Sequence, residues 1–148
     1  MRRVAPLLLA LALPVPADAA FPGRNGKVAY VGEAGGRTTL LVRQGSSVRG
    51  VLDGGAMASP AWSPQGRRIA LVRATPAGKE LWTLAHDGQG VRQVTDAPQD
   101  VGSPAWSPSG AEIAYASAGE LRVVSADGGT TRTLTAGAEP AWSARGRI

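Results

Sequence analysis

One phrase occurs three times in this chain of 148 residues, and its spacing limits the possible folds more than any other feature. The copies are SPAWSPQGRRIA at Ser59–Ala70, SPAWSPSGAEIA at Ser103–Ala114 and EPAWSARGRI at Glu139–Ile148. Their tryptophans, Trp62, Trp106 and Trp142, are 44 and 36 residues apart. A period of roughly 40 to 45 residues is typical of β-propeller blades, which are four-stranded antiparallel sheets that need neighbours to bury their faces. The spacing therefore predicts an all-β propeller.

A second pair of matching windows predicts the outer half of each blade. The windows are LWTLAHDGQGVRQVT at Leu81–Thr95 and LRVVSADGGTTRTLT at Leu121–Thr135. They align Asp87 with Asp127, each followed by glycine and flanked by alternating apolar residues. Asp-Gly between two such runs is a strong hairpin signal, because both residues tolerate the positive φ of tight turns. Each window is therefore predicted to supply the third and fourth strands of a blade.

The repeated phrase predicts the first two strands and the turn between them. Pro64 and Pro108 stand second in a Ser-Pro-x-Gly sequence, and Gly66 and Gly110 stand fourth. Proline at the second position and glycine at the fourth are preferences of a type I turn. The short apolar segments that follow, RIALV and EIAYA, are predicted strands.

The start of the chain shows a weaker copy of the same pattern. Phe21 stands seven residues before Val28, as Trp62 stands seven residues before Ile69, so a first blade with Phe in place of Trp is predicted. We expect blades at about 21–55, 58–97 and 102–137, with a partial fourth at 139–148.

About three and a half blades make an incomplete propeller, because closed propellers typically have four to eight. An open end leaves an unpaired strand edge, which is prone to self-association. Three arrangements are open: part of a longer propeller, which we favour; closure by a second copy of the chain; or a small four-bladed wheel completed by the N-terminal strands.

The first twenty residues are predicted to be a signal peptide. Arg2 and Arg3 precede the apolar run Val4–Pro16, which is too short to span a bilayer, and Ala17-Asp18-Ala19 offers small residues for cleavage after Ala19 or Ala20. We therefore expect an exported protein, periplasmic or extracellular, with no membrane span in its mature part.

The net charge of +5 comes mostly from arginines that are scattered rather than gathered in blocks. A dispersed charge on an exported chain makes nucleic acid an improbable partner. The chain has no cysteine, so no disulfide can support the fold.

The phrase PAWSPQGRRIALV followed by ELWTLAHDGQGVRQVT resembles the TolB-type, WD-repeat-like propeller family. The resemblance covers essentially all of the chain after the signal peptide, and the departures are Phe21 for Trp, Gln44 for the hairpin Asp and Ala144 for the turn Pro. It implies an exported propeller, and TolB itself is a non-catalytic partner-binding protein of the cell envelope. The same blades also occur before the catalytic domain of serine peptidases of the prolyl-oligopeptidase type and in some polysaccharide lyases.

Residues for catalysis or cofactor binding are not evident in the sequence. There is no Gly-x-Ser-x-Gly elbow, and the single histidine, His86, lies beside the Asp87 turn. Asp96 with Asp100 could at most join a weak calcium site, and loop solvation explains them better. We expect no catalytic residue, cofactor or metal.

Residues that depart from the repeat are the candidates for partner binding, because irregular loops on a rigid scaffold commonly carry function. They are Asp96 and Asp100 in the link before the third blade, Lys79 in the inserted stretch 74–79, and Trp82, whose counterpart is Arg122. The first hypothesis is a non-catalytic module that binds a protein or another envelope component. The alternative is the propeller portion of a longer peptidase or lyase whose catalytic residues lie outside this chain.

Overall fold

The computed structural model describes residues 26–96 and 99–145, and within them the chain forms three antiparallel sheets and no helix. The first sheet contains β1 (Lys27–Ala34), β2 (Arg37–Gln44) and β3 (Ser47–Asp53). The second contains β4 (Met57–Trp62), β5 (Arg68–Thr75), β6 (Gly78–Ala85) and β7 (Arg92–Gln93). The third contains β8 (Val101–Trp106), β9 (Glu112–Ser117), β10 (Glu120–Ser125) and β11 (Arg132–Ala136).

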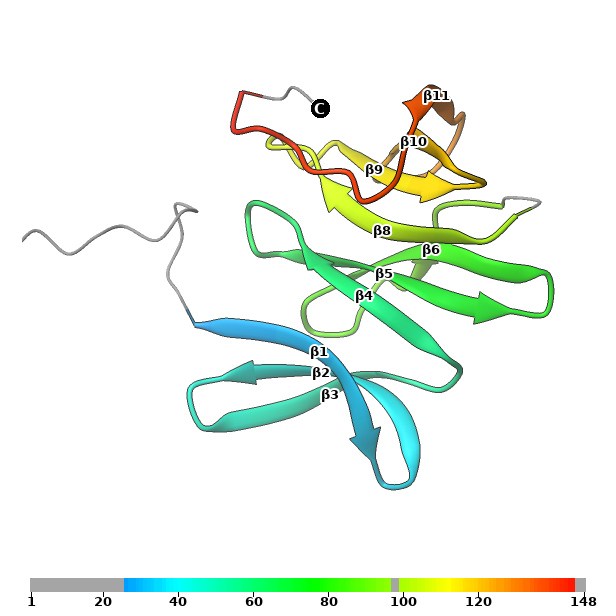
Figure 1. Ribbon diagram of the computed structural model, residues 1–148. Helices are drawn as coiled ribbons and strands as arrows, with labels where there is room; N and C mark the ends of the chain where they lie inside the picture. Colours follow the sequence, from blue (N-terminus) through cyan, green and yellow to red (C-terminus); the bar gives the residue numbers. More distant parts are fainter. Residues whose placement is uncertain (1–25, 97–98, 146–148) are drawn as a thin grey trace, which may run out of the picture.

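Strands follow one another across each sheet in chain order, and the three sheets stack face to face (Figure 1). This is the blade arrangement of a propeller, so the predicted fold class is confirmed. We call the sheets blade one, blade two and blade three. Accordingly, no helix in the described part of the chain is long and apolar enough to cross a membrane.

The middle blade is covered on both sides, and its strands are therefore apolar without strict alternation. In β5, Ile69 and Leu71 join the cluster shared with blade one, whereas Ala70 and Val72 join the cluster shared with blade three. All four are at most 4% exposed. Successive side chains of a strand point to opposite faces, so one run of four residues supplies both interfaces.

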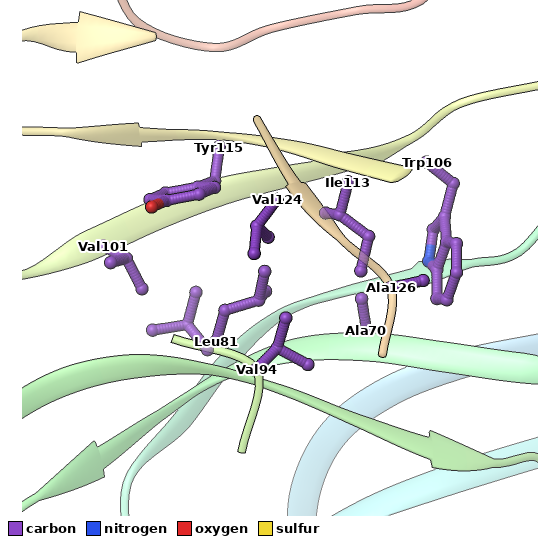
Figure 2. Packing of buried hydrophobic residues seen from close by; sticks show 10 residues of the cluster. Ala70, Leu81, Val94, Val101, Trp106, Ile113, Tyr115, Val124 and Ala126 are labelled. Carbon is purple, nitrogen blue, oxygen red and sulfur yellow. The ribbon is translucent and has the colours of Figure 1, made fainter. Parts of the chain in front are cut away.

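The cluster between blades two and three is the larger one (Figure 2). Leu81 and Val94 from blade two meet Ile113, Tyr115 and Val124 from blade three, and each is at most 6% exposed. Burying such side chains contributes about 1.5–3 kcal/mol each. This interface is thus a hydrophobic core that neither blade has alone.

The Ser-Pro-x-Gly segments form the turns that the sequence predicts. The amide of Gly66 donates to the carbonyl of Ser63 at 2.8 Å, and Gly110 donates to Ser107 in the same way. Each serine hydroxyl also accepts a hydrogen bond from the amide that begins the next strand, at 3.0 Å. The serine thus fixes both the turn and the start of the second strand.

The innermost strands of blades two and three, β4 and β8, contain a kink that the sequence does not reveal. Ser59 and Ser103 have φ of 52° and 51°, and the pairing register shifts at the same places in β4 and β8. Glu139 has φ of 53° at the matching position of the third phrase. The three copies of the phrase therefore share one unusual backbone conformation.

Two details differ from the sequence prediction. The four extra residues of blade two form no irregular loop, because they lengthen β5 and β6 to eight residues each, against six in β9 and β10. Residues 139–142 belong to none of the three sheets in the described part of the chain. The predicted signal peptide at 1–20 and the predicted first strand at Phe21 lie outside the described residues.

The strand ends define two faces of the stack. The turn face holds the turns 45–46, 63–66, 86–91, 107–110 and 126–131. The connecting face holds the tight turns 35–36, 76–77 and 118–119, the link 54–56, and residues 94–96 and 99–100.

Candidate functional site

The repeated tryptophans lie at the seams between blades. The indole Nε1 of Trp106 donates to the carbonyl oxygen of Ala61 in blade two at 3.0 Å. Trp142 donates to the carbonyl oxygen of Ala105 in blade three, also at 3.0 Å. Each of these two indoles therefore binds a carbonyl oxygen in the preceding copy of the phrase, at the alanine that comes directly before its tryptophan.

A repeated arginine joins the outer strands to the next blade. Arg49 in β3 donates to the carbonyl oxygen of Asp87 at 3.2 Å, and Arg92 in β7 donates to that of Asp127 at 2.8 Å. The third arginine of this series, Arg132, instead pairs with Glu112 of its own blade at 3.3 Å. Asp87 and Asp127 thus serve both their own turns and the seam to the preceding blade.

Arg68 ties blade two to blade three more closely than any contact that the sequence suggested. Its guanidinium pairs with Asp127 at 3.0 Å and donates to the carbonyl oxygen of Ala126 at 2.8 Å. It also lies 5.4 Å from the centre of the Trp106 ring, within range of a cation–π interaction. Sequence reasoning missed this role, because the matching residue of blade three is Glu112.

An open hollow of about 530 Å³ lies beside these bonds on the turn face. Its charged lining consists of Arg68, Arg92 and Asp127. Arg68 already pairs with the Asp127 carboxylate, and Arg92 already donates to the Asp127 carbonyl oxygen. The hollow is therefore part of the seam.

Two of the predicted partner-binding residues lie together on the connecting face. The Nζ of Lys79 is 3.2 Å from Oδ2 of Asp100, and the Lys79 amide donates to Oδ1 of the same carboxylate at 2.9 Å. The hydrogen bond from the Lys79 amide and, to a smaller extent, the one from the Lys79 side chain hold the pKa of Asp100 below its ordinary value of 3.8. The pair fastens Asp100 to the start of β6.

Asp96, the third candidate, is exposed on the same link. It directly follows Thr95, whose buried hydroxyl accepts a hydrogen bond from the Leu81 amide at 2.9 Å and donates one to Glu80. Thr95 and Asp100 are therefore each bonded to β6, at Leu81 and at Lys79.

Trp82, the fourth candidate, faces blade one rather than the link. It is half-buried against the cluster between blades one and two, and Arg73 lies 5.4 Å from the centre of its ring. The structure thus brings Lys79 and Asp100 together, places Asp96 nearby in the chain, and separates Trp82 from them.

Charges that look scattered along the sequence are sorted between the two faces. The turn face carries Lys27, Arg43, Arg49, Arg67, Arg68, Arg92, Arg132 and Arg145 against Asp87, Glu112 and Asp127. The connecting face carries Arg37, Arg73, Lys79 and Arg122 against Glu33, Asp53, Asp96, Asp100, Glu120 and Glu139. The turn face is therefore basic and the connecting face acidic.

In residues 26–96 and 99–145, no three histidine, aspartate or glutamate side chains gather as a metal site would require. Asp100, which the sequence offered for calcium, is instead bonded to a lysine. His86 lies in the β6–β7 turn beside Asp87.

Comparison with known proteins identifies the fold. No protein-family model matches this sequence, and no curated protein matches it. A putative TolB from Agrobacterium tumefaciens superposes with a TM-score of 0.69 at 22% identity, over 82% of this chain and 52% of that one. TolB from Acinetobacter baumannii gives 0.70 at 18% identity, over 82% of this chain and 33% of that one. The fold is that of a TolB-like propeller.

The resemblance seen in the repeated phrase is thereby confirmed for the fold. An oligogalacturonate lyase in complex with manganese also superposes, with a TM-score of 0.52 at 19% identity, over 67% of this chain and 30% of the lyase. This TolB-like chain spans about half, or less, of the length of these structures.

Proposed function

We propose that this protein is an exported, non-catalytic binding module that engages a protein of the cell envelope through its connecting face. The observation that carries the proposal is the bond between Lys79 and Asp100. It fixes Asp100, which lies just before β8 in a stretch that departs from the repeat, against the start of β6. A surface that is ordered before binding loses less conformational entropy on association.

The charge of the two faces supports one orientation. Asp96 and Asp100 are exposed within the acidic excess of the connecting face, so that a partner with basic residues would fit there. Charge pairs at the rim of such an interface are screened by salt, so we expect binding to weaken as ionic strength rises.

The test is a pull-down from envelope extract with the purified full chain as bait. The double variant Asp96→Ala, Asp100→Ala should lose most of the captured partner. Glu112→Ala is the matched control, because Glu112 is a partly exposed acid on the turn face that pairs with a single arginine, and it should retain the partner. Equal capture by both variants would move the site away from the connecting face. No specific partner with the unaltered chain would refute the proposed function.

Export is a separate part of the proposal. The proposal of export rests on the signal-peptide pattern of residues 1–20. Cleavage after Ala19 or Ala20 should give a mature protein that starts at Ala20 or Phe21. Mass spectrometry of the protein recovered from the envelope fraction measures this start directly.

The alternative function is the propeller portion of a longer enzyme. The structural neighbour that motivates it is the lyase, whose likeness extends to the fold alone. Cleavage of oligogalacturonate by the purified chain with manganese would replace the binding proposal by an enzymatic one.

A further inference from the structure

We propose that the hollow on the turn face between blades two and three binds an extended acidic peptide. The peptide places a carboxylate on Arg92, an apolar side chain on Val91 and its main chain beside Gly90. The hollow has a volume of about 530 Å³, which lies within the usual range of ligand sites. An acidic ligand differs from the basic partner of the connecting face, so this second site goes beyond the proposed function.

Arg92 supplies the positive charge that the peptide needs. One nitrogen of its guanidinium donates to the Asp127 carbonyl oxygen at 2.8 Å, and this bond fixes the side chain at the wall of the hollow. Its other N–H groups have no partner in the part of the chain that the structure describes. A guanidinium presents its N–H groups as a planar fork that matches the two oxygens of a carboxylate. Arg92 is therefore held in place and still able to bind an acid.

Arg68 and Asp127 limit the charge of the ligand. Arg68 pairs with the Asp127 carboxylate at 3.0 Å. It also donates to the Ala126 carbonyl oxygen at 2.8 Å and to the Thr83 hydroxyl at 2.9 Å. Since Asp127 balances Arg68, the charged lining leaves a single positive charge, that of Arg92. A carboxylate balances this charge, whereas a phosphate group carries about two negative charges and would exceed it.

The turn that lines the hollow offers main-chain groups to a peptide. Residues 89–93 are all exposed, and β7 lies at the outer edge of blade two, where it pairs with β6 alone. Within residues 26–96 and 99–145, neither Gly90 nor Val91 forms a main-chain hydrogen bond. An extended peptide that lies along such an edge can pair with these groups, as in other complexes that add a strand to a sheet. The edge is that of the middle blade, whose four strands are all described.

Val91 adds an apolar contact to this edge. Its side chain is 39% exposed, and Ala85 also lines the hollow. Covering this apolar surface with an apolar side chain favours binding. Because successive side chains of an extended peptide point to opposite sides, a peptide that alternates acidic and apolar residues presents both groups in turn.

The surroundings of the hollow attract acidic molecules. Arg67 flanks the same turn, because its carbonyl oxygen accepts a hydrogen bond from the His86 amide at 3.0 Å. Arg49 reaches the turn from blade one, through its bond to the Asp87 carbonyl oxygen. A basic surface of this kind speeds the arrival of an acidic ligand, and the effect weakens as salt screens the charges.

The test is an NMR titration of the purified full chain with a short capped peptide that alternates glutamate and valine. The amide signals of Gly90 and Val91 should shift most, and the affinity should fall as the salt concentration rises. The same peptide with glutamine in place of glutamate should bind about tenfold more weakly, because it lacks the charge that Arg92 pairs with.

Two variants and a matched control locate the site. Val91→Asp puts a negative charge at the hollow without removing a seam bond, and it should abolish binding. Arg92→Gln should weaken binding about tenfold. Arg43→Gln is the control, because Arg43 is likewise an exposed turn-face arginine that donates to a main-chain carbonyl oxygen, that of Gly45, but does not line the hollow. It should bind the peptide as the unaltered chain does.

Several results would overturn the proposal. Equal binding of the glutamate and glutamine peptides would exclude recognition of a carboxylate. Equal losses in Arg92→Gln and Arg43→Gln would show attraction to the whole turn face rather than a site. An absence of shifts at Gly90 and Val91 would leave the hollow without this ligand. Retention of the chain on vesicles of anionic phospholipid, without peptide binding, would assign the basic face to a membrane surface instead.

This site and the connecting face can fail separately. The double variant Asp96→Ala, Asp100→Ala should bind the acidic peptide as the unaltered chain does, because both residues lie on the connecting face. A pull-down without a partner would therefore leave the peptide titration unaffected, and a failed titration would leave the pull-down unaffected.

Discussion

The seam between blades one and two should be unusually sensitive to a single methyl group at Gly88. This glycine has φ of +94° in the β6–β7 turn, and a Cβ atom built there would clash with the carbonyl oxygen of Val51 in β3. Real Cβ atoms essentially never approach closer than 3.0 Å, so Gly88→Ala must separate the two blades or distort the turn.

The magnitude follows from two costs. A left-handed conformation costs an alanine about 1–2 kcal/mol relative to glycine. Forcing extra volume into a packed contact typically costs a further ~1–3 kcal/mol, and a displaced turn would also weaken the bond from Arg49 to the Asp87 carbonyl. We therefore expect Gly88→Ala to lower the free energy of unfolding by about 3 kcal/mol.

The matched control lies two residues along the same turn. Gly90 has φ of +61°, and a Cβ atom added to it would meet no atom within 4 Å, so Gly90→Ala carries the conformational cost without the clash. Its expected loss is about 1 kcal/mol. Urea unfolding followed by tryptophan fluorescence measures both variants, and the difference of about 2 kcal/mol corresponds to roughly a 30-fold change in the unfolding equilibrium constant. Equal losses for the two variants would show that the seam is not closely packed at Val51.

Two further outcomes are expected. Trp106→Phe removes the hydrogen bond to the Ala61 carbonyl and should lower the free energy of unfolding by about 1 kcal/mol more than Trp82→Phe, because the Trp82 Nε1 has no partner among the described residues; equal losses in urea unfolding would contradict this. The carboxyl of Asp100, followed by NMR, should titrate below 3.8. Its ionised form therefore stabilises the folded protein above pH 3.8, and this stabilisation is lost as the pH falls through the lowered pKa. Lys79→Ala should raise that midpoint only in part, since the backbone amide at position 79 still donates; an unchanged midpoint would remove the side chain from the explanation.

The fold could be predicted from the sequence because the propeller repeats its own signals. The tryptophan phrase, the Ser-Pro-x-Gly turn and the Asp-Gly hairpin recur at matching distances, and each has a local physical cause. Blades two and three follow this pattern strand by strand. The longer β5–β6 hairpin was harder to predict, because the Pro76 segment reads as a loop although it only forms the tight turn between two extended strands.

The contacts between blades were beyond sequence reasoning. Arg92 and Arg132 align in the sequence, but the bond of Arg92 ends on a main-chain carbonyl of another blade, and no residue type marks such an acceptor. The meeting of Lys79 with Asp100 likewise depends on where a link crosses the end of a hairpin. The sorting of charges between two faces also appears only once strand direction is known.

The acceptors at these seams have a consequence for how such chains change over time. Ala61, Ala105, Asp87 and Asp127 each receive the neighbouring indole or guanidinium at a peptide oxygen, which every amino acid possesses. These seam bonds therefore do not depend on which side chain stands at the receiving position, although the Asp127 carboxylate also pairs with Arg68. A duplicated or transplanted unit would find a compatible neighbour at once, so gene rearrangement can lengthen or shorten such an array without redesigning any junction.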